Sequence, residues 1–273
     1  MFICDYHTHT CFSFDGDKSS TPASLCRSAI EKGISDIAIT DHFECNFTDG
    51  NDYPPYDRKS AYNAICEARE KYGDKINLTY GIEIGQANQC PKEAEKLLKD
   101  QNFEFVIASL HNLTNQPDFY YIDFSRLDDD RQIGIWFEQY IDELSDIVDT
   151  VPQIDTIGHL TYMQRYIALC GKQYDFTRHF EKLSDFFDKI IKRKIALEVN
   201  VSTLSKGLGF AMPDQSILSL YKDCGGKLIT LGSDAHSPEG LGNCIQDGFN
   251  LIKTVGFDEV CVVRNGKKVQ IKI

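Results

Sequence analysis

The sequence predicts an α/β fold in which parallel strands close into a TIM-like barrel. Short β-rich runs alternate with longer amphipathic runs along the chain, which is typical of repeated strand–helix units. The predicted strands are almost continuously apolar, as expected when both faces of a parallel sheet are buried. Seven units with right-handed crossovers favour a (β/α) barrel over a doubly wound open sheet, which is the second possibility.

The first three units have well-defined turn and cap residues. The strand at 2–6 is followed by a helix that Thr21 caps, Pro22 opens and Gly33 ends. Strands are then expected at 36–40 and 76–84, with helices that end near Tyr72 and begin at Pro91. The order strand, helix, strand is therefore set from the beginning of the chain.

The other four units repeat this order. Their strands are predicted at 103–109, 155–158, 195–199 and 227–232, and their helices at 129–148, 175–193, 213–226 and 239–255. Two further β-type runs flank Asn265 and Gly266, a pair that favours a tight hairpin turn. No linker or low-complexity segment interrupts the pattern, so residues 1–273 are expected to form a single domain.

The composition excludes several classes of protein. The formal net charge of −12 disfavours nucleic acid as the main partner, because binding to a phosphate backbone needs a basic surface. No apolar run reaches the length of about 18 residues that a membrane-spanning helix needs, so no membrane association is expected. The sequence gives no indication of the oligomeric state.

The ten cysteines are expected to be reduced thiols rather than a disulfide framework. No CxxC motif occurs, the spacing is irregular, and the N-terminus lacks the features of a signal peptide. Cys4, Cys26, Cys66 and Cys261 lie in apolar periodic segments and are expected to be buried. These features predict a cytoplasmic location.

The positions of the histidines point to a metal site. Six of the seven histidines follow predicted strands, and in a parallel barrel the ends of the strands meet on one face. These six are His7, His9, His42, His111, His159 and His236. The spacing H-x-H places two imidazoles on the same side of a strand, because side chains repeat with a period of two.

Three carboxylates join these histidines at the same predicted face: Asp15, Glu83 and Asp234. Imidazole and carboxylate together suit Zn²⁺, Mn²⁺ or Fe²⁺. Nine protein ligands are too many for one ion, so two or three divalent ions with a bridging carboxylate are expected. Such ions would make the site positive despite the acidic chain, and a phosphate dianion would then bind there. Asp5 and Asp41 are expected to orient ligands rather than to bind metal, whereas Glu198 is expected either to orient a histidine or to reach the metals itself.

Seven segments together make the sequence resemble the PHP (polymerase and histidinol phosphatase) family, and most closely its histidinol-phosphatase branch. The segments are DYHTHTCFSFDG (5–16), ITDH (39–42), YGIEIG (80–85), IASLH (107–111), DTIGHL (155–160), LEVN (197–200) and ITLGSDAH (229–236). The resemblance extends over nearly the whole chain. It implies a distorted seven-stranded (β/α)7 barrel with up to three metal ions at the C-terminal ends of the strands.

The resemblance also implies how the ligands are shared among three metal sets. The first set is His7, His9, Glu83 and Asp234; the second is Glu83, His111 and His159; the third is Asp15, His42 and His236. Asp17 competes with Asp15 for the third set, and the spacing favours Asp15. The resemblance does not fix the identity of the metals.

Two basic residues are expected to contact the substrate. Arg165 matches a position that binds phosphate in the histidinol-phosphatase branch, and Lys206 lies in the loop after the sixth predicted strand. Ser205 stands where that branch often has an arginine. Because arginine binds phosphate with two parallel hydrogen bonds and lysine acts as a point charge, this change affects the predicted phosphate clamp.

The resemblance implies hydrolysis of L-histidinol phosphate to L-histidinol and phosphate in histidine biosynthesis, by attack of a metal-bridging hydroxide. Glu83, Asp234 and His236 are the expected catalytic residues. Alternative functions are a related phosphoesterase acting on a nucleotide or sugar phosphate and an inactive metal-bound module. An amidohydrolase-type enzyme is also conceivable, although no lysine at a strand end suggests a carbamylated bridge.

Overall fold

Parallel strands form the centre of the molecule, for which the computed structural model describes residues 2–46, 55–100 and 102–273. The strands of the main sheet are β1 (Cys4–Asp5), β2 (Asp36–Ile39), β3 (His42–Glu44), β4 (Asn77–Gly85), β5 (Phe105–Ser109), β6 (Thr156–Ile157), β7 (Ala196–Asn200) and β8 (Ile229–Gly232). Seven of them pair in parallel in the order β1-β2-β4-β5-β6-β7-β8, and the short β3 pairs with β4 alone.

The first and last strands of this order meet, which nearly closes the barrel. The backbone N–H of Tyr6 donates to the carbonyl of Leu231 at 2.8 Å, and Asp234 N donates to His7 O at 2.8 Å. A parallel bridge between Thr8 and Ala235 extends this contact. Strands in sequential order whose ends meet form a barrel rather than a doubly wound sheet, so the predicted fold class is confirmed.

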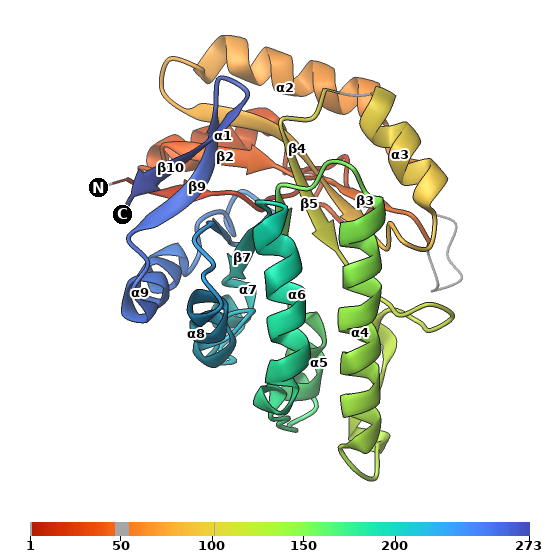
Figure 1. The fold of residues 1–273 in the computed structure, drawn as a ribbon. Helices are drawn as coiled ribbons and strands as arrows, with labels where there is room; N and C mark the ends of the chain where they lie inside the picture. The colour runs from red at the N-terminus through yellow and green to blue at the C-terminus, as the bar shows by residue number, and fades with distance from the viewer. Residues whose placement is uncertain (1, 47–54, 101) are drawn as a thin grey trace.

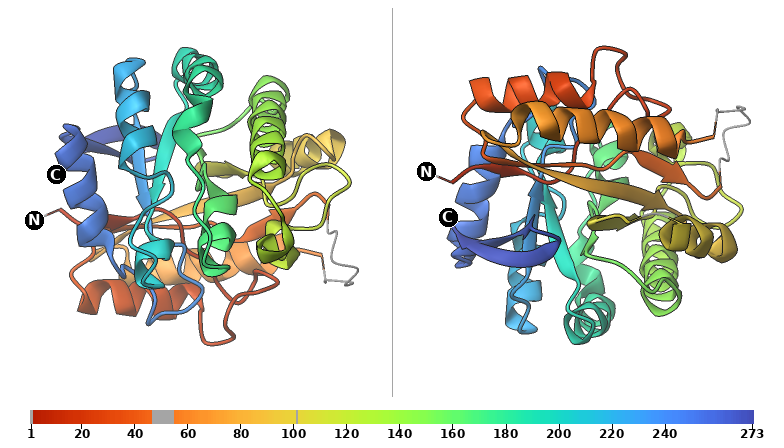
Figure 2. Two further views of the ribbon diagram at one scale, coloured as in Figure 1. Left: turned by 90° about the horizontal axis from the view of Figure 1, so that it is seen from below. Right: turned by 90° about the horizontal axis from the view of Figure 1, so that it is seen from above.

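Helices surround the sheet (Figures 1 and 2). They are α1 (Pro22–Glu31), α2 (Arg58–Tyr72), α3 (Pro91–Asp100), α4 (Arg131–Thr150), α5 (Tyr162–Leu169), α6 (Phe180–Lys192), α7 (Ser202–Ser205), α8 (Gln215–Asp223) and α9 (Ile245–Val255). Each long helix buries one apolar stripe. In α6 the buried side chains are Leu183, Phe186, Phe187 and Ile190, the spacing of one helix face.

A C-terminal hairpin of β9 (Glu259–Arg264) and β10 (Lys267–Lys272) packs at the N-terminal end of the barrel strands. Asn265 and Gly266 both have positive φ, at 52° and 67°, as a two-residue hairpin turn requires. Arg264 forms an ion pair with Asp36 at the start of β2, and Asn77 at the start of β4 donates to Val263 O at 2.8 Å. The C-terminal ends of the strands, where the candidate ligands were expected, lie at the opposite end of the barrel.

The structure differs from the prediction at several element boundaries. The segment 42–44, expected as a loop, forms β3, and α5 and α7 follow β6 and β7 where no helices were expected. Helix α8 begins after Pro213, because the Asp214 side chain caps it by accepting hydrogen bonds from two backbone N–H groups. Helix α9 begins at Ile245 rather than near 239. Cys66 is exposed on the outer face of α2, so the expectation that it is buried is wrong.

None of the helices in the described part of the chain has both the length and the apolar character needed to cross a membrane.

Candidate metal centre

The nine predicted metal ligands come together at the C-terminal ends of six strands. They are His7, His9 and Asp15 after β1, His42 in β3, Glu83 in β4, His111 after β5, His159 after β6, and Asp234 and His236 after β8. Eight of them form overlapping groups of three, in which the ligand atoms lie within 4.8 Å of one another. The ninth, Asp15, has its Oδ2 3.0 Å from His236 Nε2. We call these nine residues the ligand cluster.

Glu83 lies at the centre of the ligand cluster. Its Oε2 is 3.1 Å from His7 Nε2 and 3.0 Å from His42 Nδ1. Its Oε1 is 2.9 Å from His159 Nε2 and 3.3 Å from His111 Nε2. The side chain is fully buried. Burial alone would raise the pKa of Glu83, but the nearby imidazoles hold that pKa well below its usual range. The carboxylate is charged, and its two oxygens face different imidazoles. This is the arrangement needed by a carboxylate that bridges two metal ions.

Asp234 is the second carboxylate of the cluster. Its Oδ1 lies 3.3 Å from His9 Nε2 and 3.7 Å from His7 Nε2, while its Oδ2 accepts a hydrogen bond from Arg165 at 2.9 Å. The backbone φ of Asp234 is 57°, in the left-handed region that costs about 1–3 kcal/mol for most residues. The backbone is therefore held in an unfavourable conformation that directs this carboxylate toward the histidines.

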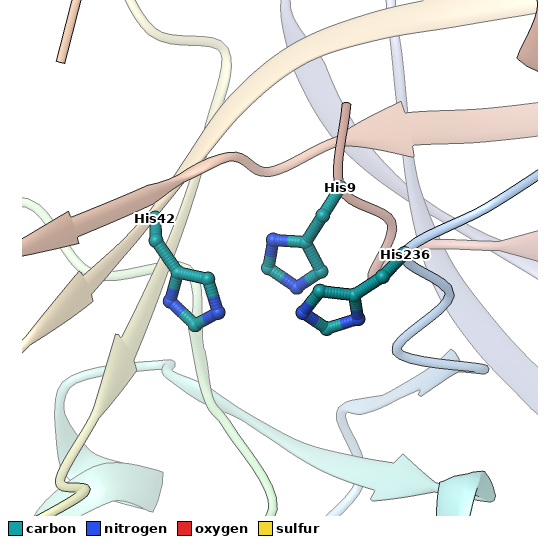
Figure 3. A group of neighbouring side chains, drawn as sticks. All are labelled: His9, His42 and His236. Atoms are coloured by element: carbon teal, nitrogen blue, oxygen red, sulfur yellow. The ribbon is translucent and has the colours of Figure 1, made fainter. Parts of the chain in front are cut away.

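His9, His42 and His236 lie side by side at the outer part of the cluster (Figure 3). The ring centroid of His9 is 4.3 Å from that of His42 and 4.2 Å from that of His236. Asp15 is beside the same group, with its Oδ2 3.7 Å from His42 Nε2. Asp17, the alternative to Asp15, accepts hydrogen bonds from Ser19 instead and is exposed.

The residues fit bound metal ions, because several of their polar atoms are buried without a hydrogen-bond partner. These atoms are His7 Nε2, His9 Nε2, Glu83 Oε2 and His159 Nδ1. Buried imidazole and carboxylate atoms are normally satisfied, and each unsatisfied one requires an explanation such as an ion. Imidazole nitrogen and carboxylate oxygen are both ligands for Zn²⁺ and similar divalent ions. The cluster could therefore hold metal.

The electrostatics favour neutral imidazole at one position and charged imidazole at another. Burial, with His236 and His42 nearby, lowers the pKa of His9 to about 3, so this ring is neutral and free to bind a cation. Burial would also lower the pKa of His42, but Glu83 and Asp15 raise it to about 9. In the absence of metal, the positive charge of His42 offsets the buried carboxylates beside it.

Further carboxylates orient the cluster from outside. Glu198 Oε1 lies 2.6 Å from His7 Nδ1, so the hydrogen on that nitrogen leaves Nε2 free to face Glu83. Asp41 accepts hydrogen bonds from Thr10 N and Oγ, which fixes the loop that carries His9. Asp5 accepts from Ser233 N at 2.9 Å, next to Asp234. These contacts agree with the orienting roles that the sequence indicated.

A cavity of about 500 Å³ opens onto the cluster. Arg165 and Lys206 both line it, together with Tyr120, Tyr121, Tyr162 and Tyr166. Arg165 is buried in α5, and its Nε has no hydrogen-bond partner. Lys206 follows α7 and keeps part of its side chain exposed; the loss of hydration on its covered part and the nearby Arg165 lower its pKa. The structure therefore places both predicted substrate contacts beside the ligand cluster.

Two acidic residues in the cavity lining were not predicted. Glu44 lies between His42 and His111, and Asp118 precedes the short 3-10 helix at Phe119–Tyr121. For Glu44 a signal was present, because H-x-E at 42–44 has the same period-two spacing as H-x-H at 7–9. For Asp118 no sequence signal was available, because it lies in a long polar loop.

Comparison with known proteins agrees with the resemblance. The model of the PHP domain matches residues 5–202. A histidinol-phosphatase of Lactococcus lactis is 27% identical over 97% of this chain and 95% of its own length. A probable histidinol-phosphatase of Thermotoga maritima is 26% identical over 98% of this chain and 97% of its own.

Among solved structures, the histidinol phosphate phosphatase of Lactococcus lactis, complexed with zinc, L-histidinol and phosphate, superimposes with a TM-score of 0.80. It is 25% identical and covers 98% of both chains.

Replacing Glu83 is expected to remove most of the stabilisation that a divalent ion gives to the folded chain. An ion at 100 times its Kd adds about 2.7 kcal/mol to the stability. At about 2–4 °C per kcal/mol for a chain of this size, Mn²⁺ or Zn²⁺ should raise Tm by roughly 5–10 °C. Glu83→Gln should remove most of this rise, because Glu83 belongs to two of the three expected metal sets; thermal melts with and without metal measure it.

Glu104→Gln is the matched control, because Glu104 pairs with Arg69 at the far end of the barrel. This variant should keep the full rise in Tm. An unchanged rise in Glu83→Gln would show that Glu83 does not contribute to a metal site.

Proposed function

Because the chain belongs to the PHP domain family, we propose that it is a metal-dependent phosphomonoesterase that hydrolyses L-histidinol phosphate to L-histidinol and phosphate. The observation that carries the reaction type is the ligand cluster, in which one carboxylate faces imidazoles from four other strands. We further propose that residues 1–273 act as one barrel domain.

We propose three metal sets within the cluster. His7, His9, Glu83 and Asp234 would hold the first ion; Glu83, His111 and His159 the second; and Asp15, His42 and His236 the third. The distances given above support these assignments, although His9 also lies against the third set. When bound, two or three Zn²⁺, Mn²⁺ or Fe²⁺ ions would supply Lewis acidity and a water of lowered pKa.

Arg165 is proposed to bind the substrate phosphate. Its Nη2 donates to Asp234 Oδ2 and to Ser202 Oγ, and its guanidinium carbon lies 5.2 Å from the ring centroid of Tyr162. These contacts fix the guanidinium before a ligand arrives, so little conformational entropy is lost on binding. The guanidinium, which lines the cavity, then offers charge-assisted hydrogen bonds to a phosphate oxygen.

Lys206 is proposed as the second cation at the phosphate. Ser205, at the position where arginine was expected, donates its hydroxyl to Ser202 O and does not line the cavity. Lys206, the next residue, does line it. The positive charge is therefore kept by the following residue, although as a point charge rather than a planar fork.

Glu83, Asp234 and His236 remain the proposed catalytic residues. Glu83 and Asp234 bring two buried carboxylates to the place where the metal ions would bind, and both are held charged by their cationic neighbours. His236 lies at the rim, where its side chain keeps 33% of its exposure and is within reach of both Asp15 and the cavity.

The cavity lining favours a substrate with a cationic leaving group. Asp118 and Glu44 add negative charge, and Tyr120 and Tyr121 add aromatic faces, which together suit an ammonium or an imidazolium group. Burial raises the pKa of Asp118 to about 6, and a bound cation would favour its charged form. Histidinol carries such a cation, whereas a sugar leaving group does not.

The substrate assignment is tested by comparing kcat/KM for L-histidinol phosphate and para-nitrophenyl phosphate with enzyme loaded with Mn²⁺, Zn²⁺ or Fe²⁺. We expect a preference of about 10³-fold or more, equivalent to about 4 kcal/mol of differential transition-state binding. Glu83→Ala and Asp234→Ala should abolish both reactions while the apo-proteins stay folded.

Slow turnover of the aryl phosphate without this preference would keep the phosphomonoesterase and reject the substrate. Nucleotide and sugar phosphates tested in parallel would then identify the related alternative.

Asp118→Asn is expected to raise KM for L-histidinol phosphate by roughly 10-fold or more, because a hydrogen bond to a charged group contributes about 1.5–3 kcal/mol. The kcat/KM for para-nitrophenyl phosphate should change by less than about 3-fold, since that leaving group has no cation. Asp123→Asn is the matched control: Asp123 is in the same segment but pairs with Ser125 outside the cavity. Equal effects on both substrates would contradict the proposed role.

Lys206→Ala is expected to raise KM for both phosphates by about 10-fold, because the phosphate is common to both. Lys182→Ala, which removes a surface ion pair between Lys182 in α6 and Asp142 in α4, should leave KM unchanged. Kinetics at two ionic strengths provide a second check, since the loss should be larger at low salt. A KM for Lys206→Ala equal to that of the original chain would exclude Lys206 from the phosphate site.

A further inference from the structure

Glu44, the last residue of β3, connects two histidines that come from different strands. Its Oε1 lies 3.1 Å from His42 Nδ1 and 3.0 Å from His111 Nδ1. The side chain is 5% exposed, so water does not compete strongly for these contacts. One buried carboxylate oxygen therefore accepts from two imidazoles.

These two imidazoles belong to different metal sets. His111 Nε2 lies 3.3 Å from Glu83 Oε1, in the second set, and His42 Nε2 lies 3.7 Å from Asp15 Oδ2, in the third. A carboxylate at Nδ1 keeps the hydrogen on that nitrogen and leaves the Nε2 lone pair free for a metal. His42 Nδ1 is also 3.0 Å from Glu83 Oε2, so without Glu44 the Nδ1 of this ring would face the Glu83 carboxylate alone.

Gly85 provides the space that Glu44 occupies. β3 and β4 lie side by side (Figure 1). They pair in parallel, with Glu44 opposite Gly85 and His42 opposite Glu83. A Cβ on residue 85 would lie 2.2 Å from Glu44 Oε2 and 2.6 Å from Glu44 Cδ and Oε1. Real Cβ atoms do not approach so closely, and Gly85 does not have a positive φ that would itself require glycine. The Glu44 carboxylate occupies the space that a side chain at residue 85 would fill.

We propose that Glu44, seated over Gly85, is a positioning residue that orients His42 and His111 together and so couples the second and third metal sets. The proposal rests on the metal-dependent function proposed above. It assigns a role to the H-x-E spacing at 42–44 and to the final glycine of YGIEIG. The first set, built on His7, His9, Glu83 and Asp234, includes neither of the histidines that Glu44 holds, and it is expected to bind its ion without Glu44.

Metal binding by the full chain, without substrate, tests this role. The apo-proteins are dialysed against graded free Mn²⁺, and bound metal is measured by elemental analysis. Glu44→Gln and Glu44→Ala should weaken binding of two ions by about 10- to 100-fold, the usual effect of removing a group that orients a ligand. Binding of the remaining ion should not change. Glu104→Gln is the matched control and should follow the curve of the original chain.

Gly85→Ala provides an independent route to the same effect. Because the added methyl group would displace the Glu44 carboxylate, this variant should lose metal in the same way as Glu44→Ala. In the double variant, Gly85→Ala should add nothing to Glu44→Ala, since contacting residues that act through one interaction are not additive. If Gly85→Ala does not fold, Glu44→Gln, which preserves the size of the side chain, decides the question alone.

A purely structural role would give a different result. It would lower Tm of the apo-protein without changing the metal affinity, and that outcome overturns the proposal. If the unmodified chain binds metal and both Glu44 variants bind it with the same affinity as the unmodified chain, this inference is overturned and the proposed function is not. An unmodified chain that binds no metal overturns the proposed function, and this inference with it.

Discussion

The buried carboxylate of Glu83 imposes the strongest constraint on this structure. It lies among imidazoles contributed by β1, β3, β5 and β6, and its charge is tolerated because these groups compensate it. Breaking a buried ionic arrangement of this kind costs several kcal/mol, because an uncompensated charge remains in a medium of low dielectric. Each of these strands must therefore end where its histidine can reach the Glu83 carboxylate. The parallel register that sets His42 opposite Glu83 is one direct expression of this requirement.

Closure of the barrel serves the same centre. Asp234 N donates to His7 O across the junction of β8 and β1, so the bond that closes the sheet also brings the second carboxylate to the first imidazole. The hairpin β9–β10 packs over the opposite end, where Arg264 and Asn77 hold it. In parallel barrels, residues at the N-terminal ends of the strands usually stabilise the fold, and residues at the C-terminal ends usually form the active site. Asp234, whose backbone has an unfavourable positive φ, lies at the C-terminal end of the strands with the other members of the ligand cluster.

The sequence predicts seven strands of the sheet, their order and all nine members of the cluster, because apolar runs and period-two spacing are local properties, but it misses β3. It does not predict Glu44, whose role depends on the vacant side-chain position at Gly85 in the neighbouring strand. Asp118 and the environment of Arg165 are missed for a similar reason. Helix α5, which buries Arg165 against Tyr162, follows β6 after only four residues and has too few turns to give a clear pattern. Contacts between segments, rather than patterns within them, account for what was not foreseen.

The charges of the cavity explain how an acidic chain can bind a phosphate ester. The net charge of −12 belongs to the whole molecule, while the cavity separates its charges. Arg165 is fixed by Asp234, so the guanidinium that would meet the phosphate is bonded to a carboxylate of the metal centre. Any shift of Asp234 on metal binding would therefore also move Arg165. Asp118 and Glu44 line the same cavity with negative charge. A ligand with an anionic group and a cationic group satisfies both kinds of residue, whereas one with two anionic groups would leave a phosphate facing these carboxylates. The charges of this lining therefore suit a zwitterionic phosphate ester.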